Sequence, residues 1–570
     1  MSAFAAAYRE LRTSWRTRRT IAAAAFLVAA LGPLVLGEAR TADVADGLYL
    51  ACAAVGLAFA VGVAGLPSLA QGAFVAVGAV TGAHLLAAGA PTPVAALAGG
   101  IGGGLSGLLV GYAFARLPRA GFAAATWVVS WLVAFALQSI TWFLGGSQGI
   151  VVTGGPTETQ HYELALLLTG LVALGYVALA HSPLGLGLAA AREREAAALA
   201  LDVPVLRLRA VAVAASGAVA GVVGALAVQL AGVGDPSQYG PFLSFRLFVV
   251  VLIGGALSPL GPPAGVLVLG LLSLAADAVG RLENIAAARA HTLLTAVMLL
   301  GIVSLGWEGI VRPARRVRRS APGSGPGRTE PTTLEATALG KAFDSVTAAD
   351  DIALSVEPGR ITALVGPNGS GKTTVLRMLA GTVAPDAGRI DAPAGAVART
   401  LQSTAVFPTL TPLEHILVAS AGRRTLGGLI RSLFATPKAR AEDAAYVEHA
   451  RRLLVRFAIP EDVPAGELPV SDQRALMVAA AYATGASVLL VDEPTAGASA
   501  READRIIDLL RSLRTEGLAL LVVEHNLGAV RRLADRIIVL DAGRVIADGP
   551  PDAVAVDPAV RAAYLGRAAL

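Results

Sequence analysis

Residues 361–374 read ITALVGPNGSGKTT, and they decide the fold of the C-terminal half of the chain. An apolar, β-branched run leads into Gly366-x4-Gly371-Lys372-Thr373 and then into helix formers, which is the strand, turn and helix of a P-loop. Backbone N–H groups of such a loop wrap a phosphate, and the helix N-terminus adds positive potential. The expected phosphate-binding residues are Gly366, Pro367, Asn368, Gly369, Ser370, Gly371, Lys372, Thr373 and Thr374. Lys372, one of three lysines in 570 residues, would reach the outer phosphates, and Thr373 would hold Mg²⁺.

Two later apolar runs end in residues that suit phosphoryl transfer. ASVLLVDEP at 486–494 predicts a buried strand that ends in two carboxylates, and LALLVVEH at 518–525 predicts another that ends in a histidine. Asp492 would hold Mg²⁺ through water, Glu493 would polarise the attacking water, and His525 could contact the γ-phosphate. Alternatively, the two acids close a strand and the histidine is a surface residue. Their combination with a P-loop favours the catalytic interpretation.

The composition separates the two halves of the chain. Hydrophobic residues make up 55% and charged residues 15%, which excludes disorder and most soluble single-domain enzymes. The apolar excess lies in residues 20–310. The formal net charge is only +5, and arginines cluster beside apolar segments, so a membrane surface explains them better than nucleic acid. Cys52 is the single cysteine, which excludes an intrachain disulfide and a cysteine-based metal site.

Apolar segments near the length of about 20 residues that crosses a bilayer predict a polytopic membrane domain. They lie near 20–37, 46–65, 66–89, 92–115, 121–144, 162–180, 208–232, 246–280 and 290–310. The first could instead be a signal peptide. Prolines and a glycine interrupt 246–280 at 258–263, which predicts a re-entrant hairpin or two short spans, and eight to ten crossings in total. Gly103, Gly107 and Gly111 predict a close helix contact.

We therefore expect an α-helical polytopic membrane domain over 1–310 and a cytoplasmic α/β P-loop domain over 332–570. Between them, the stretch 311–331 has five arginines between residues 312 and 319, followed by Ala-Pro-Gly-Ser-Gly-Pro-Gly. Such a stretch is typical of a basic membrane anchor that runs into a flexible linker.

The order of these motifs resembles that of an ABC transporter ATPase, over about 332–567. Within that superfamily, RTLQSTAVFPTLTPLEHILVA at 399–419 and the tail at 537–566 resemble ATPases of the branched-chain amino acid uptake family. The resemblance implies that Gln402 joins the metal to the membrane interface and that His525 is the switch histidine. It also implies that Glu493 is the catalytic base and that the Phe343 ring stacks on adenine.

The membrane half resembles the matching permease family in GLPSLAQGAFVAVGAVTGAHL at 65–85 and LGGSQGI at 144–150. The stretch 181–205 resembles the cytoplasmic loop that carries the coupling helix, with Arg192, Glu195, Ala196 and Ala197 in it, although Asp202 replaces a glycine of the family. Ser68 and Gln71, polar residues in the 65–85 segment, are candidates for the substrate path. Interhelical hydrogen bonds explain them about as well.

The signature sequence departs from the family. Its L-S-x-G-Q-Q pattern is replaced here by Leu468, Pro469, Val470, Ser471, Asp472 and Gln473. In the ATP-bound dimer, the signature of one subunit packs against the γ-phosphate held by the other. Proline removes a donor, serine replaces a glycine that allows close approach, and an aspartate adds an anion beside an anion. We therefore expect a heterodimer with unequal sites, or else a homodimer with two weak signatures.

Together these features imply ATP-driven, Mg²⁺-dependent transport of a small solute across a bacterial plasma membrane. The family suggests import of a branched-chain or hydrophobic amino acid or a related compound. It also implies a second permease, a second ABC ATPase and an extracytoplasmic binding protein. The position of the arginines argues against a nucleic-acid partner. The alternatives are an ATP-driven exporter and a membrane sensor or scaffold that binds ATP without pumping.

Overall fold

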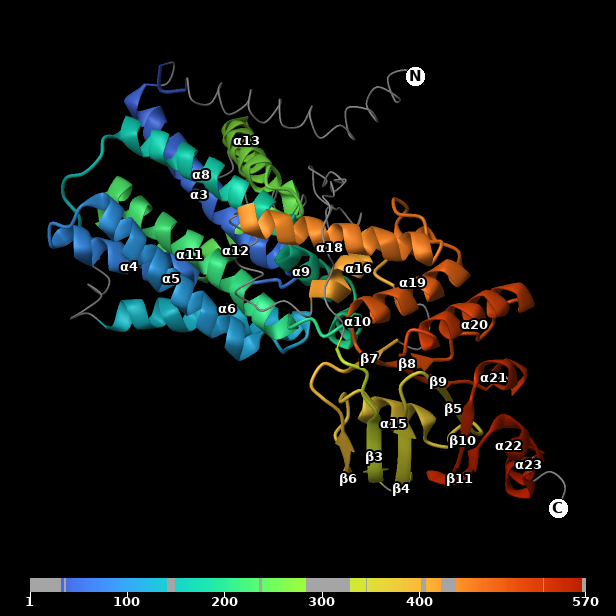
Figure 1. Ribbon diagram of the computed structural model, residues 1–570. Coiled ribbons are helices and arrows are strands. Elements are labelled where there is room, and N and C mark those ends of the chain that lie inside the picture. The colour runs from blue at the N-terminus through green and yellow to red at the C-terminus, as the bar shows by residue number, and fades with distance from the viewer. Residues whose placement is uncertain are drawn as a thin grey trace. The chain divides into compact units, whose positions relative to one another are not determined.

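The computed structural model describes residues 32–34, 37–140, 149–234, 238–282, 329–344, 346–400, 406–421, 437–525 and 527–565. They divide into two compact units, shown in Figure 1. The first unit holds the described residues of Met1–Arg192 and Val205–Val317, and the second holds those of Glu193–Pro204 and Arg318–Leu570. The predicted linker at 311–331 lies almost wholly outside the described residues.

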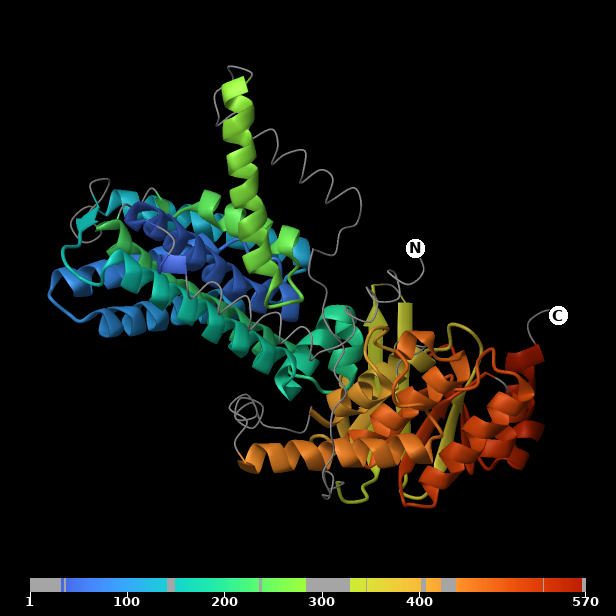
Figure 2. The same ribbon diagram turned by 90° about the horizontal axis from the view of Figure 1, so that it is seen from above.

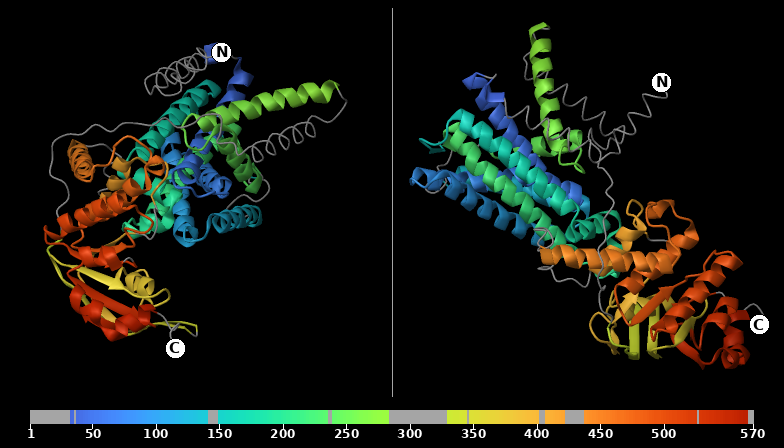
Figure 3. Two further views of the ribbon diagram at one scale, coloured as in Figure 1. Left: turned by 90° about the vertical axis from the view of Figure 1, so that its right-hand side faces the viewer. Right: turned by 45° about the horizontal axis from the view of Figure 1, so that its top comes forward.

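The first unit is a bundle of apolar helices, and Figure 3 shows its long helices running side by side. Its elements are η1 (Gly32–Leu34), α3 (Glu38–Ala58), η2 (Phe59–Val63), α4 (Gln71–Ala87), α5 (Thr92–Phe114), α6 (Arg119–Ser139), β1 (Ile150–Val151), α8 (Glu158–Ala180), α9 (Pro183–Glu193), α11 (Val205–Ala231), β2 (Val233–Gly234), α12 (Pro241–Gly254) and α13 (Gly261–Leu282). Within the described part, five helical stretches are long and apolar enough to cross a membrane. Most of the predicted first span and all of the predicted last one lie outside the described residues.

Glycines bring the backbones of α5 and α11 together. A Cβ added to Gly103 would lie 2.2 Å from the carbonyl oxygen of Gly217, and one added to Gly221 would lie 2.1 Å from that of Gly99. α11 also meets α4 closely: a Cβ on Gly224 would lie 2.0 Å from the carbonyl oxygen of Val75. The close helix contact predicted from the glycine repeat is confirmed, and α11 packs against both α4 and α5.

The interrupted segment at 246–280 forms two helices. α12 ends at Gly254 and α13 begins at Gly261, so the break falls at the predicted prolines. A Cβ on Gly254 would lie 1.8 Å from the carbonyl oxygen of Gly261, so glycines let the two helices meet closely. α12 has 14 residues, about 21 Å of helix, which is shorter than the apolar core of a bilayer. Figure 2 shows α13 (light green) projecting away from the rest of the bundle.

The second unit contains two sheets. Its strands are β3 (Leu334–Phe343), β4 (Val346–Val356), β5 (Ile361–Val365), β6 (Ala387–Asp391), β7 (Val397–Arg399), β8 (Val488–Asp492), β9 (Ala519–Val523), β10 (Arg536–Asp541) and β11 (Arg544–Gly549). The larger sheet has the order β11-β10-β5-β9-β8-β7, parallel except for β11. The smaller sheet, β4-β3-β6, is antiparallel. Every residue of β5, β8 and β9 is buried, as the apolar runs predict.

The helices of this unit are α10 (Glu195–Ala200), α15 (Lys372–Leu379), α16 (Pro412–Ala421), α18 (Pro437–Arg456), η5 (Ala465–Glu467), α19 (Val470–Ala483), α20 (Ala500–Arg514), α21 (Leu527–Leu533), α22 (Pro551–Val556) and α23 (Pro558–Leu565). A core of side chains from both sheets and α15 joins the two sheets. Because β5, β8 and β9 are parallel neighbours, their carboxyl ends lie at one edge of the larger sheet. That edge carries the P-loop, the two carboxylates and the histidine.

Candidate active site

The P-loop connects β5 to α15 in the predicted way. Gly371 caps α15 with a φ of 100°, a left-handed conformation that favours glycine. A Cβ on Gly366 would lie 2.1 Å from the carbonyl oxygen of Leu540, so only glycine fits there. The Lys372 ammonium donates to the carbonyl oxygens of Gly366 (2.8 Å) and Pro367 (2.7 Å), and to the Ser370 hydroxyl. Burial lowers the pKa of Lys372, although Glu493 and Asp492 oppose the shift.

Asp492, the last residue of β8, has one bound and one unbound carboxylate oxygen. Its Oδ2 accepts from Arg399 at 3.0 Å, in an ion pair with side chains 9% and 1% exposed. Its Oδ1 is buried, and no described residue bonds to it. Burial raises the pKa of Asp492, and Arg399 opposes the shift. A buried carboxylate oxygen without a donor is suited to a cation or its water, so this residue fits the expected Mg²⁺.

In the described part of the chain, this site included, no group of three or more His, Cys, Asp or Glu side chains could hold a metal. Mg²⁺ in nucleotide sites is usually held by one or two protein ligands together with phosphates and water. Thr373, in the first turn of α15, is the second protein ligand expected. When bound there, Mg²⁺ would neutralise charge that develops on the phosphates.

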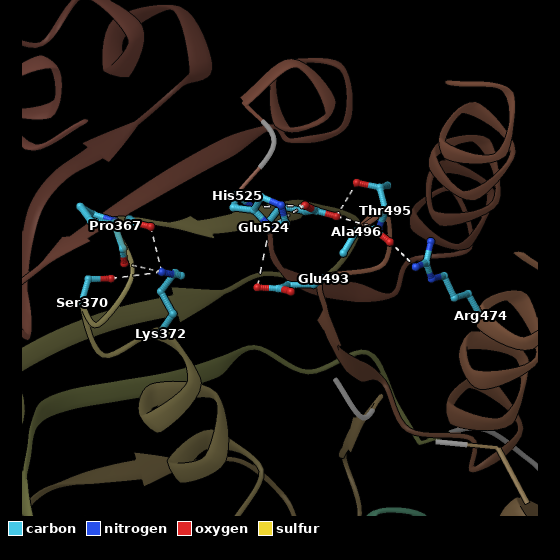
Figure 4. A network of polar contacts seen from close by, with 10 residues as sticks. Pro367, Ser370, Lys372, Arg474, Glu493, Thr495, Ala496, Glu524 and His525 are labelled. Carbon is cyan, nitrogen blue, oxygen red and sulfur yellow. Dashed lines mark hydrogen bonds and ion pairs between the residues drawn. The ribbon is translucent and has the colours of Figure 1, made fainter. Parts of the chain in front are cut away.

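Glu493 and His525 meet beyond the ends of β8 and β9 (Figure 4). Their Oε1 and Nδ1 atoms are 3.8 Å apart, and the histidine side chain is 56% exposed. Glu493 has a φ of 45°, which is rare for a residue other than glycine, and its N–H donates to the carbonyl oxygen of Val523 at 2.9 Å. The structure therefore brings the two predicted catalytic side chains together.

Sequence reasoning missed two residues at this edge. Glu524, between Val523 and His525, is fully buried, and its Oε1 accepts from the Thr495 backbone N–H at 2.8 Å and the Thr495 hydroxyl at 2.6 Å. Arg399 is the partner of Asp492. The only available signal was a charged residue at the end of an apolar strand.

The remaining predicted nucleotide residues are in different situations. Phe343 ends β3 with a ring that is 47% exposed, and Lys341 lies over it at 5.6 Å from the ring centroid. An exposed ring of this kind is available for stacking on a base. Gln402 lies outside the described residues.

The signature segment leads into a helix, and its aspartate is held in an ion pair. Pro469 caps α19, and Gln473 donates to the carbonyl oxygen of Leu468 at 2.8 Å. Asp472 forms an ion pair with Arg505 of α20 at 2.7 Å. The expected repulsion between Asp472 and a phosphate is therefore weakened, because the carboxylate already has a cation. The donor lost at Pro469 and the side chain added at Ser471 are unaffected.

Residues of the predicted coupling helix lie at the end of α9 and in α10. Arg192 donates to the carbonyl oxygen of Gly62 in the first unit. In the second unit, α10 begins at Glu195, Ala196 is exposed and Ala197 is buried. Asp202 has a φ of 57°, which explains the glycine that the family has there: this is the left-handed region, which aspartate tolerates better than most residues.

Of the two substrate-path candidates, Ser68 lies between η2 and α4 and Gln71 is the first residue of α4; both are fully buried. The Gln71 amide donates to the carbonyl oxygens of Ala53 and Ser216, and accepts from the Ser216 hydroxyl at 2.9 Å. Ser68 accepts from the N–H of Ala70. The Gln71 contacts match the interhelical hydrogen bonds that were the alternative, whereas the Ser68 bond is local. A role of either residue in the substrate path stays a prediction.

Comparison with known proteins assigns both units. Residues 44–303 match the permease component of the branched-chain amino acid transport system, 349–496 match the ABC transporter family, and 544–569 match the branched-chain amino acid ATP-binding cassette transporter family. The high-affinity branched-chain amino acid transport ATP-binding protein BraF of Pseudomonas aeruginosa is 33% identical over 251 residues, 41% of this chain and 98% of that protein.

The ribose import ATP-binding protein RbsA of Rhodococcus jostii is 32% identical over 243 residues, but the match spans only 46% of it. A crystal structure of a nucleotide-free ATP-binding cassette from an ABC transporter is 28% identical, with a TM-score of 0.36 over 41% of this chain and 99% of that one. The protein is thus embedded in a membrane through its permease half, and its cytoplasmic half binds ATP and couples ATP hydrolysis to transport. The chain belongs to the branched-chain amino acid family of ABC transporters, with permease and ATPase joined in one polypeptide.

Proposed function

We propose that this chain is one half of an ATP-driven importer of branched-chain or other hydrophobic amino acids, or related compounds, in a bacterial plasma membrane. The permease match over 44–303 supports this cargo, because the permease, and not the ATPase, contains the translocation path. The likeness to ribose import proteins spans 243 residues of this chain, too few to include both halves. It therefore supports ATP hydrolysis more than it supports a sugar cargo.

For hydrolysis at this P-loop, we propose that Lys372 binds the outer phosphates while Thr373 and Asp492 hold Mg²⁺. Glu493 polarises the attacking water, and His525 contacts the γ-phosphate. The observation that carries this assignment is the 3.8 Å separation of Glu493 and His525 at the sheet edge that bears the P-loop. Phe343 stacks on adenine, and Gln402 links the metal to the membrane interface.

We propose a heterodimer with unequal nucleotide sites. ATP on this P-loop faces the signature of a second ABC ATPase, and ATP on that second P-loop faces the altered signature of this chain. Pro469 supports the asymmetry, because it offers no N–H and no hydroxyl where the family has a donor. A second permease and an extracytoplasmic binding protein complete the assembly, and Arg192, Glu195, Ala196 and Ala197 belong to its coupling segment.

The test measures uptake by cells whose chromosomal copy of this gene is deleted and which express the gene from a plasmid. Wild type should restore uptake of radiolabelled leucine, isoleucine or valine, and Glu493→Gln should abolish it while the purified protein still binds ATP. The matched control is Glu516→Gln, which removes another carboxylate of the same unit that bonds to Tyr482. Restored ribose uptake without amino acid uptake would reject the cargo. An unchanged uptake in Glu493→Gln would reject the hydrolysis assignment.

Purification of the tagged chain from the same membranes tests the partners. Mass spectrometry should identify a second ATPase that has an intact signature, together with a permease. Recovery of this chain alone, as a homodimer with a normal transporter rate of ATP hydrolysis, would reject the heterodimer.

A further inference from the structure

Glu524 is a fully buried carboxylate beside the proposed catalytic pair, and the hydrolysis scheme above does not use it. Buried carboxylates are rare unless they are bonded or functional. Its Oε1 accepts two hydrogen bonds from Thr495, and its Oε2 accepts one from the His525 backbone N–H at 3.2 Å. Figure 4 shows these contacts next to Glu493 and the P-loop.

We propose that Glu524 is a positioning residue for ATP hydrolysis, which holds Glu493 and His525 in facing positions by clamping the two chain segments that carry them. The proposal rests on the roles assigned above to Glu493 and His525. Glu524 itself is not a catalytic residue, because it is fully buried and its hydrogen bonds go to the chain.

The clamp continues the sheet beyond its last regular pair. β8 and β9 pair in parallel up to Asp492 and Val523, and the Glu493 N–H then donates to the Val523 carbonyl. The next contacts between the two segments are those of Glu524 with Thr495. Glu493 is thus held between a backbone bond on one side and a side-chain clamp two residues later.

The backbone conformation of Glu493 is one that the clamp has to enforce. Its φ of 45° is unfavourable for glutamate, and such a conformation persists only where the surroundings enforce it. If the Thr495 segment were released, Glu493 could relax towards an ordinary φ and swing its carboxylate away from His525. A shift of about 1 Å at a reacting group can cost about 100-fold in rate.

Glutamine cannot replace Glu524 fully. A carboxylate accepts at both oxygens, whereas an amide accepts at one end and donates at the other. In Glu524→Gln, either the Thr495 donors or the His525 N–H would face an NH₂ group. The substitution keeps the size of the side chain. It disturbs either the Thr495 bonds that join the two segments or the local bond to the His525 N–H that orients the Glu524 side chain.

The experiment measures the ATPase kinetics of the full chain, purified by its tag together with the subunits that bind it. The rate of the Lys372→Ala complex is subtracted, so that only hydrolysis at this P-loop is counted. We expect Glu524→Gln to lower kcat about tenfold or more while KM for ATP changes less than about twofold. Thr495→Val, which loses the hydroxyl donor, should lower kcat severalfold, and Thr495→Ser should recover most of it. The double variant Glu524→Gln/Thr495→Val should be no slower than the slower single variant, because both remove one clamp.

Glu516→Gln is the matched control, since it removes a carboxylate that bonds to the Tyr482 hydroxyl elsewhere in the same unit, and its kcat should stay unchanged. A Glu524→Gln kcat within about twofold of wild type would overturn the proposal, as would a rise in KM with kcat unchanged or full additivity in the double variant. The Glu493→Gln complex separates the two proposals. If it still hydrolyses ATP normally, the base assignment fails, whereas an inactive Glu493→Gln beside a fully active Glu524→Gln rejects the clamp alone.

Discussion

Asp492 and Arg399 form a buried ion pair at the metal edge of the sheet, and the two charges depend on each other. Removing one partner of such a pair costs roughly 3–5 kcal/mol, because the other charge is left buried. We expect Arg399→Met to lower the apparent Tm of the purified protein strongly in EDTA. MgADP should recover part of the loss, since a bound cation supplies charge beside Asp492.

Arg544→Met is the control for this measurement. It breaks a pair with Asp350 whose side chains are 72% and 42% exposed, and exposed pairs contribute little. Equal apparent Tm values for the two variants in EDTA would contradict a structural role for the buried pair.

His415 predicts a pH dependence of stability. Its Nε2 accepts from the Phe407 N–H at 2.8 Å, and burial lowers its pKa from 6.5 to about 3. Below about pH 6.5, His415 is therefore protonated in the unfolded chain but stays neutral in the folded chain. The resulting stability is fully present above pH 6.5 and is lost, at up to about 1.4 kcal/mol per pH unit, as the pH falls towards 3.

The measurement is the apparent Tm between pH 7.5 and 4.5 for wild type and His415→Gln. Glutamine can accept the same hydrogen bond and does not titrate, so the variant should lose less Tm than wild type on acidification. If the apparent Tm of the two proteins fell in parallel with pH, His415 would not control the loss of stability in acid.

The residues of the site differ in how far a sequence can place them. The P-loop and the two strand ends are local patterns, so Lys372 and Glu493 were predictable from consecutive residues. The partners Arg399 and Glu524 depend on which strands become neighbours, and no local spacing encodes that pairing. The ion pair between Arg505 and Asp472 was equally unpredictable, because the two residues lie on different helices.

At the scale of elements, the glycines of α11 lie against the backbones of α4 and α5, and they predict a sharp sensitivity to one added methyl group. In Gly221→Ala, the new Cβ would lie 2.1 Å from the Gly99 carbonyl oxygen, so the helices must separate. Overpacking of this kind costs about 1–3 kcal/mol. We expect a lower apparent Tm of the detergent-purified protein.

Gly175→Ala in α8 is the matched control, because a Cβ there meets nothing within 4 Å. It should leave the apparent Tm unchanged or raise it slightly, since alanine is the better helix former. If Gly221→Ala behaved like Gly175→Ala, the close contact of α5 and α11 would be refuted.

Hydropathy predicted the apolar helices better than their irregularities. The proline break between α12 and α13 was visible, because proline cannot continue a helix. The π-helical turn at Phe59–Val63 was not, and neither was the irregular stretch between it and α4. That stretch is tolerated because Thr126 and Ser130 of α6 bond to both backbone groups of Leu69, a contact between segments distant in sequence that hydropathy does not report.

For the whole molecule, the altered signature predicts unequal turnover in the assembled transporter. In the proposed heterodimer, changing Lys372 to Ala would leave hydrolysis only at the P-loop of the second ATPase, opposite this signature. Restoring the family pattern with Pro469→Ser, Ser471→Gly and Asp472→Gln should raise that residual rate about tenfold, comparable to the effect of one donor on a developing charge. The measurement is ATPase activity of the purified complex, and an unchanged rate would reject the asymmetric arrangement.

The division of the chain was partly visible from composition. We propose domain limits of 1–310 and 332–570 joined by a linker at 311–331, because hydropathy changes there. The structure adds that the described residues of Glu193–Pro204 cluster with the ATPase unit, where Glu193 accepts from the N–H of Thr409 at 3.1 Å. Composition could not show this, because it reports which residues are apolar. It does not report that a segment packs with a different unit from the residues on either side of it.

The interlocked glycines also restrict how the permease can move. Where the backbones of α4, α5 and α11 touch without intervening side chains, sliding one helix past another would force carbonyl groups through each other. Packed interfaces of this kind switch between discrete arrangements and do not deform smoothly. We expect these three helices to travel as a single rigid body, so that alternating access is produced by rocking at its borders, where α3, α6 and α12 meet it.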